Sequence, residues 1–212
     1  MTAGCRDVAG EQAVLVAALR NPACYPHPAE QVEVIETHIS YVLLSGAYAY
    51  KIKKAVALGF LDFSTLARRR MYCEEELRLN RRLAPELYLA VVAITGPPDV
   101  PRFAGNGEAI EYAVQMARFS QEDLLDRQLA AGCLSPDMID QLADQLADFH
   151  GGAERAPPDG RFGSPEAVWE PMAQNFAQLG KQLSDAAHRS RLADLEAWSR
   201  KRFSQLAGLL AT

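Results

Sequence analysis

The stretch that decides the fold is residues 35–83, which read IETHISYVLLSGAYAYKIKKAVALGFLDFSTLARRRMYCEEELRLNRRL. It holds two runs rich in Tyr, Val, Ile and Leu, residues 41–45 and 48–56, separated only by Gly46 and Ala47. Residues of these types favour strands, and a small-residue break between two such runs predicts a β-hairpin.

The second strand of this hairpin carries lysines at alternating positions. Side chains alternate between the two faces of a strand, so Ala49, Lys51 and Lys53 share one face. Lysine is depleted from strands, and this spacing needs a cause. An anionic ligand over this face, or an acidic side chain from the next helix, would supply one. A charged edge strand that resists aggregation is the other explanation.

An acidic helix is predicted over residues 65–83, with Ser64 as its N-cap, because Leu, Arg and Glu are strong helix formers. It contains three consecutive glutamates, residues 74–76. At least one of them should border the packed side, since the apolar Leu79 follows one turn later. The other glutamates and the arginines at 68–70 are expected to form a solvated face.

The rest of the chain predicts three more strands and five more helices. The strands cover residues 32–36, 88–95 and 110–116, and the helices cover residues 11–20, 121–131, 136–150, 165–183 and 190–210. The joint at residues 37–40 has no glycine, so any phosphate contact there would come from the backbone and from the hydroxyls of Thr37 and Ser40. His27, between two prolines, is expected at the surface.

Composition indicates a soluble globular protein. Of the 212 residues, 49% are hydrophobic and 23% charged, and the net charge of −5 argues against a general nucleic-acid binder. No apolar run reaches the length of a membrane span, and the N-terminus lacks a secretion signal, so we expect a cytoplasmic location. The cysteines are expected to be reduced thiols without a zinc site; they are Cys5, Cys24, Cys73 and Cys133.

The order of parts resembles the protein-kinase-like fold, and three runs carry the resemblance. The runs ETHISYVLLSGAYAYKIKK, GFLDFSTL and EEELRLNRRLAPELYL are similar to those of aminoglycoside phosphotransferase and choline-kinase-like enzymes, within a bacterial subgroup that is largely uncharacterised. The resemblance implies an α+β fold. Residues 1–116 would form an N-lobe with a five-stranded antiparallel sheet and one long helix, and residues 117–212 an incomplete helical C-lobe.

The resemblance also implies a nucleotide site. Ala49-x-Lys51 matches the Ala-x-Lys of the family's third strand, so Lys51 would hold the α- and β-phosphates of ATP, and a glutamate of the next helix would orient it. Glu75 is the preferred partner because it lies one turn before a packed leucine, and Glu76 is the close alternative. Lys53 lies on the same face and could take the place of Lys51.

Three further residues are implied at the link between the lobes. There the family's backbone groups hydrogen-bond the adenine edge, and in this sequence the matching residues are Gln115, Met116 and Ala117. Simple core packing is the alternative role for Met116.

The family's reaction centre is missing from this sequence. Its catalytic loop reads His-Gly-Asp with a downstream Asn, and a second Asp holds magnesium. Here His150-Gly151-Gly152 has a glycine in place of the Asp. We therefore expect a nucleotide-binding part that is inactive alone and has no catalytic or metal-binding residues of its own. Three explanations stay open: a fragment of a longer enzyme, a pseudokinase-like module that binds a nucleotide or a protein, and a site completed by another chain. In each case the small molecule that accepts the phosphoryl group is unknown. We expect the chain to associate with other protein chains through its exposed helical surface.

Overall fold

The computed structural model describes residues 8–157, 160 and 162–210, so Cys5 lies outside the described residues. The chain divides into two compact units, residues 1–143 and 144–212, and each is described by itself. The described helices include none with the length and apolar character needed to cross a membrane.

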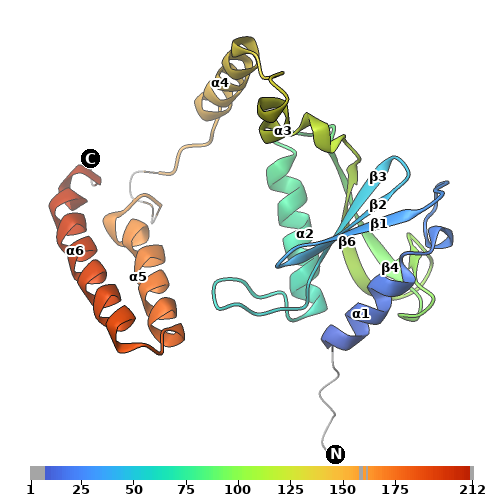
Figure 1. Ribbon diagram of the computed structural model, residues 1–212, viewed down its shortest axis with the longest axis horizontal. Helices are drawn as coiled ribbons and strands as arrows, with labels where there is room; N and C mark the ends of the chain where they lie inside the picture. Colours follow the sequence, from blue (N-terminus) through green and yellow to red (C-terminus); the bar gives the residue numbers. More distant parts are fainter. Residues whose placement is uncertain (1–7, 158–159, 161, 211–212) are drawn as a thin grey trace, which may run out of the picture. The chain divides into compact units, whose positions relative to one another are not determined.

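The first unit is built on an antiparallel sheet of six strands in the order β1-β2-β3-β6-β4-β5 (Figure 1). The strands are β1 (Val32–Glu36), β2 (Ser40–Ser45), β3 (Tyr48–Lys53), β4 (Tyr88–Thr95), β5 (Arg102–Phe103) and β6 (Ala109–Ala117). The α+β class is confirmed, but the expected count of five strands is wrong. The additional strand, β5, pairs with the end of β4 inside a segment predicted as loop. With two residues it is too short for an alternating pattern to reveal it.

The hairpin predicted from residues 41–56 is present. Ser45 pairs with Tyr48 across the two-residue turn, and Gly46 adopts a φ of 55°. A Cβ at this glycine would lie 2.8 Å from the carbonyl oxygen of Pro28, so both the backbone angle and the close approach favour glycine. β3 ends at Lys53 rather than at residue 56 because its partner strand begins opposite that lysine.

The long helices lie where the sequence predicts them, but their first and last residues differ from the predicted bounds. They are α1 (Val8–Ala18), α2 (Leu66–Asn80), α4 (Pro136–Gly151), α5 (Pro165–Gln182) and α6 (Ala186–Leu210). The N-cap of α2 is Thr65, whose hydroxyl accepts from the Arg68 N–H, and not Ser64. The helix predicted over residues 121–131 is broken by Leu124, which is extended, into a 3₁₀ turn and α3 (Leu125–Ala130).

The two faces of the sheet are covered by different elements. On one face Leu43, Tyr50 and Ile52 form the apolar core with Leu15 of α1 and Leu19, which follows the end of that helix. The opposite face, which carries the alternating lysines of β3, meets α2. Helix α2 also packs against β4 and β6. The alternation predicted for β3 therefore separates a core face from a charged face.

An aromatic cluster extends the core face and includes His27, which lies in a loop as expected but is half-buried there. The His27 ring stacks on Tyr50 and lies 4.8 Å from the Tyr48 ring. Its Nδ1 lies 3.1 Å from the carbonyl oxygen of Pro28 and its Nε2 lies 3.0 Å from the Tyr50 hydroxyl. Burial raises the pKa of Tyr50 to about 12, so its hydroxyl stays protonated at neutral pH.

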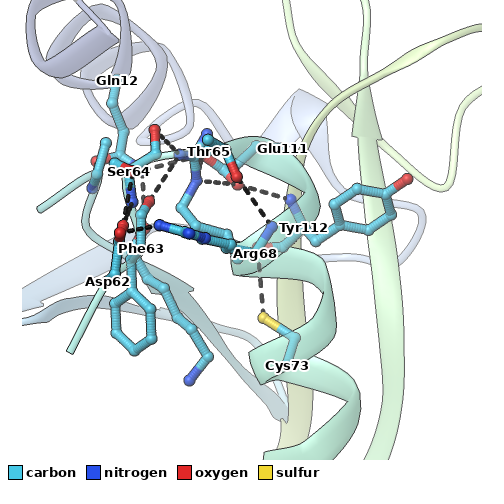
Figure 2. Close-up of polar contacts among 12 residues, drawn as sticks. Gln12, Asp62, Phe63, Ser64, Thr65, Arg68, Cys73, Glu111 and Tyr112 are labelled. Carbon is cyan, nitrogen blue, oxygen red and sulfur yellow. Dashed lines mark hydrogen bonds and ion pairs between the residues drawn. The ribbon is translucent and has the colours of Figure 1, made fainter. Parts of the chain in front are cut away.

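A buried polar network joins α1, α2 and β6 at one end of the sheet. Arg69 and Glu111 are 3% and 1% exposed, and Nε of Arg69 donates to both carboxylate oxygens at 2.9 Å. The amide of Gln12 donates to Glu111 and to the carbonyl of Lys53. Figure 2 shows Gln12 and Glu111 within this network. The expectation that Arg69 belongs to a solvated face is wrong, although its neighbour Arg68 is exposed.

The helical part of the chain buries little by itself. Between residues 118 and 210, Ser199 is the one residue among those described that is buried. Apolar side chains such as Ile139, Leu179 and Trp198 are 45%, 45% and 61% exposed. Neighbouring α5 and α6 meet through Trp169 and Phe203, whose rings lie 5.1 Å apart.

Replacing the buried arginine should destabilise the chain strongly. Arg69→Leu leaves the carboxylate of Glu111 buried without its cation, which costs about 3–5 kcal/mol of unfolding free energy. Arg68→Leu is the matched control, because it removes an exposed ion pair with Asp62 and should cost less than about 1 kcal/mol. Urea denaturation followed by circular dichroism measures both. Equal losses in the two variants would contradict the structural role given to Arg69.

Candidate functional site

The candidate site is a cluster of two lysines of β3 around one carboxylate of α2. Nζ of Lys51 lies 2.8 Å from Oε1 of Glu76, and Nζ of Lys53 lies 2.6 Å from Oε2. Each carboxylate oxygen thus has its own ammonium donor. Charge-assisted hydrogen bonds of this kind are among the strongest that side chains make.

The packing of α2 on the sheet brings the carboxylate to the lysines. Cys73, one turn before Glu76, is fully buried, and its Sγ lies 4.0 Å from the carbonyl oxygen of Tyr112 on β6. Burial raises the pKa of the Cys73 thiol to about 12, so it stays protonated. The small side chain of Cys73 lets the helix approach the strands closely enough for Glu76 to reach β3.

The side chains of the two lysines differ in solvent exposure, and so in how accessible they are to a ligand. The side chain of Lys53 is 7% exposed and its Nζ lies 5.0 Å from the centre of the Phe63 ring, whereas the side chain of Lys51 is 30% exposed. Two ammonium groups around one carboxylate leave a formal charge of +1. The accessible part of that charge belongs to Lys51, so the cluster can attract an anion there.

The cluster keeps Glu76 ionised. Burial raises the pKa of the carboxyl, but the hydrogen bonds and charges of Lys51 and Lys53 outweigh this effect, so the pKa of Glu76 lies below its ordinary value. The ionised carboxylate is the form that can orient two ammonium groups.

The preference for Glu75 as the partner of Lys51 is wrong. Glu75 is on the outer side of α2, where both of its oxygens accept hydrogen bonds from Arg78. Hydrogen bonding to Arg78 lowers the pKa of the Glu75 carboxyl. The alternative, Glu76, is the residue that faces the sheet, because it follows the buried Cys73 by three residues and so lies on the same side of the helix.

Of the three residues expected to link the lobes, none lies in a connecting segment. Gln115, Met116 and Ala117 are the last residues of β6. Met116 is in register with Ala49 and shares the face of Lys51, while Gln115 points to the opposite face and donates to the Tyr50 hydroxyl. The connecting segment begins only at Arg118, after the strand has ended.

The backbone donors at this end of β6 already have partners. The N–H of Ala117 donates to the carbonyl oxygen of Leu87 at 2.9 Å, and the N–H of Arg118 donates to the carbonyl oxygen of Ala47, also at 2.9 Å. An adenine edge could therefore not take these two donors without breaking sheet contacts. The implied adenine contact does not fit Ala117 as a donor.

Neither hydroxyl that could have contacted a phosphate near residues 37–40 is available, because that of Thr37 is hydrogen-bonded and that of Ser40 is buried. Thr37 Oγ1 accepts from the N–H of Ser40 and donates to its carbonyl. The hydroxyl of Ser40 is buried without a hydrogen-bond partner. Over the described ranges, no three His, Cys, Asp or Glu side chains come together as metal ligands do.

The sequence reasoning missed the polar network of Gln12, Arg69 and Glu111. One signal was available: Glu111 interrupts an apolar strand pattern, and an acid that faces the core needs a cation. Nothing in the sequence identified which arginine of the run at 68–70 would supply it.

Comparisons with known proteins give relatives without a described function. The chain is 33% identical over 159 residues to proteins described as uncharacterised from two strains of Mycobacterium tuberculosis and from Mycobacterium bovis. The match covers 74% of this chain but 30% of the relatives' length. No family model matches the chain. No solved structure matches it.

The lowered pKa of Glu76 predicts a pH-dependent contribution to stability. A carboxyl whose pKa is lower in the folded state stabilises the fold above its unfolded pKa, here about 4.5, and this stability is lost as the pH falls through the folded pKa. The difference in unfolding free energy between the natural chain and Glu76→Gln should therefore shrink below about pH 4.5. Urea denaturation from pH 3 to pH 7 measures it.

The matched control for this experiment is Glu75→Gln, because the two glutamates are neighbours and the side chain of Glu75 is 47% exposed, against 13% for Glu76. Its effect should be small at every pH. A difference for Glu76→Gln that stays constant down to pH 3 would contradict the ion cluster.

Proposed function

We propose that this chain is the nucleotide-binding part of an ATP-dependent phosphotransferase of the aminoglycoside phosphotransferase-like kind, with a protein-kinase-like fold. The acceptor would be a hydroxyl of a small molecule. The observation that carries the proposal is the Lys51–Glu76 ion pair between the third strand and the following helix. In protein kinases the corresponding ion pair must form before the lysine can hold the phosphates of ATP.

The charge and exposure of the cluster support this assignment. Lys51 is the more exposed of the two lysines, so it can donate a hydrogen bond to a phosphate oxygen while Glu76 fixes its position. Lys53 is held by the other oxygen of the same carboxylate. A phosphate would complete the cluster by balancing its remaining positive charge.

The fit to ATP is better for the phosphates than for the base. Lys51 suits a triphosphate, whereas the N–H groups of Ala117 and Arg118 are used within the sheet. Adenine would therefore have to pack against apolar side chains of the Lys51 face, such as Ala49 and Met116, rather than take its donors from these groups. A complete enzyme would also need magnesium, whose ligands we expect from another part of that enzyme.

A second candidate function is a non-catalytic module that binds a nucleotide or a protein partner. The exposed apolar side chains that α4, α5 and α6 each carry favour it, because exposed apolar surface beyond scattered single residues commonly marks an interaction site. A cytoplasmic location suits both candidates and remains a prediction.

Removing the Lys51 ammonium should weaken nucleotide binding. A charge-assisted hydrogen bond contributes about 1.5–3 kcal/mol, so Lys51→Ala should raise the Kd for ATP by roughly tenfold to a hundredfold. Isothermal titration calorimetry with the 212-residue chain measures it. The variant should stay folded because Lys53 keeps a cation beside Glu76.

Lys54→Ala is the control, since this neighbouring lysine is engaged with Glu36. Its Kd should match that of the natural chain. If Lys51→Ala binds ATP as well as Lys54→Ala does, the site assignment is wrong. A chain that binds no ATP but self-associates in light scattering would favour the interaction module.

The chain alone should transfer no phosphoryl group. Magnesium ligands and the residue that orients the acceptor hydroxyl provide most of the charge stabilisation and positioning in such reactions, and the sequence has no His-Gly-Asp loop. Release of ADP from Mg-ATP with aminoglycosides or choline as acceptors should not exceed that of Lys51→Ala. Turnover that the Lys51→Ala substitution abolishes would contradict this expectation.

A further inference from the structure

A cavity lies in the first unit, and none of its lining residues belongs to the lysine cluster. It has a volume of about 670 Å³ and lies where α1, the start of α2 and the start of β6 meet. Pockets for small ligands fall in this size range and combine apolar walls with a few polar groups. Here the apolar walls come from Leu15, Leu66, Pro98 and Ile110.

On the floor of the cavity, Arg69 offers a hydrogen-bond donor from its guanidinium group. Arg69 lines the cavity and is 3% exposed. Its Nε binds Glu111 and its Nη1 donates to the carbonyl of Phe63, but Nη2 donates to no group in the described part of the chain. Both oxygens of Glu111 are occupied by donors from Arg69, Gln12 and the backbone. An acceptor atom of a ligand is what this floor can bind.

The rim of the cavity is acidic. Glu11 of α1 and Glu108, just before β6, both line the cavity and are exposed. Glu111 below them is neutralised by Arg69, so the two rim carboxylates set the sign of the local charge. They favour a ligand that presents a positive charge to solvent and an uncharged acceptor to the floor.

We propose that this cavity binds a small organic cation with three features: a protonated amine at the rim, an apolar body against the walls, and a carbonyl-type acceptor facing Nη2 of Arg69. An amino-acid amide or the N-terminus of a peptide has this chemistry. The inference stands independently of nucleotide binding, because the cavity shares no lining residue with the lysine cluster.

Binding of a cationic and an anionic probe with the same apolar body tests the proposal. At pH 6.5 L-leucinamide is mostly protonated, whereas N-acetyl-L-leucine is an anion of similar size. Titration of each into the ¹⁵N-labelled chain should give saturable shifts of backbone amides at Gln12, Leu66 and Ile110 for L-leucinamide. The anion should bind at least tenfold more weakly.

Three variants make the test specific. The double variant Glu11→Gln/Glu108→Gln should bind L-leucinamide with about tenfold lower affinity. The control Glu33→Gln/Glu86→Gln changes the net charge by the same amount at exposed positions elsewhere, and its affinity should equal that of the natural chain. Ala109→Phe, which narrows the cavity, should abolish binding in a chain that still unfolds cooperatively. Equal affinity for both probes, shifts away from the cavity, or an undiminished affinity in the rim variant would overturn the proposal.

Discussion

The carboxylate of Glu76 is the constraint on which the rest of the candidate site depends. One acidic group on α2 must satisfy two ammonium groups on β3, at 2.8 Å and 2.6 Å, in a place where water has little access. Because Lys53 is almost fully buried, loss of the carboxylate would leave a buried cation without a partner, which is strongly unfavourable. The position of α2 against the sheet is therefore fixed by charge as well as by apolar packing.

The same helix is fixed a second time near its other end. Arg69 binds Glu111 of β6, and Gln12 connects that pair to the backbone of Lys53 and Ala55. Lys53 thus takes part in both polar clusters, through its side chain in one and its carbonyl in the other. Buried polar groups that are paired with one another specify one arrangement of the elements, since a shift would break several of these hydrogen bonds at once. The result is a rigid setting for Lys51, the one member of the cluster with an accessible ammonium.

The sequence predicts the local parts of this arrangement better than the long-range ones. The hairpin and the face that holds Lys51 and Lys53 follow from alternation and turn chemistry. The glutamate partner is implied by the family resemblance, since the lysine spacing alone leaves an anionic ligand or a charged edge strand as alternatives. The choice between Glu75 and Glu76 follows from neither, because it depends on which side of α2 is buried, and that is set by Cys73 against β6. The burial of Arg69 and the packing of His27 among tyrosines likewise depend on segments far apart in the chain.

The most direct measurement of the central claim is a crystal structure of the chain with a non-hydrolysable ATP analogue. The account predicts phosphate oxygens within hydrogen-bond distance of Lys51 Nζ, with Glu76 still in contact with both lysines. An analogue bound elsewhere, or a Lys51 side chain turned to solvent with Glu76 unpaired, would contradict it.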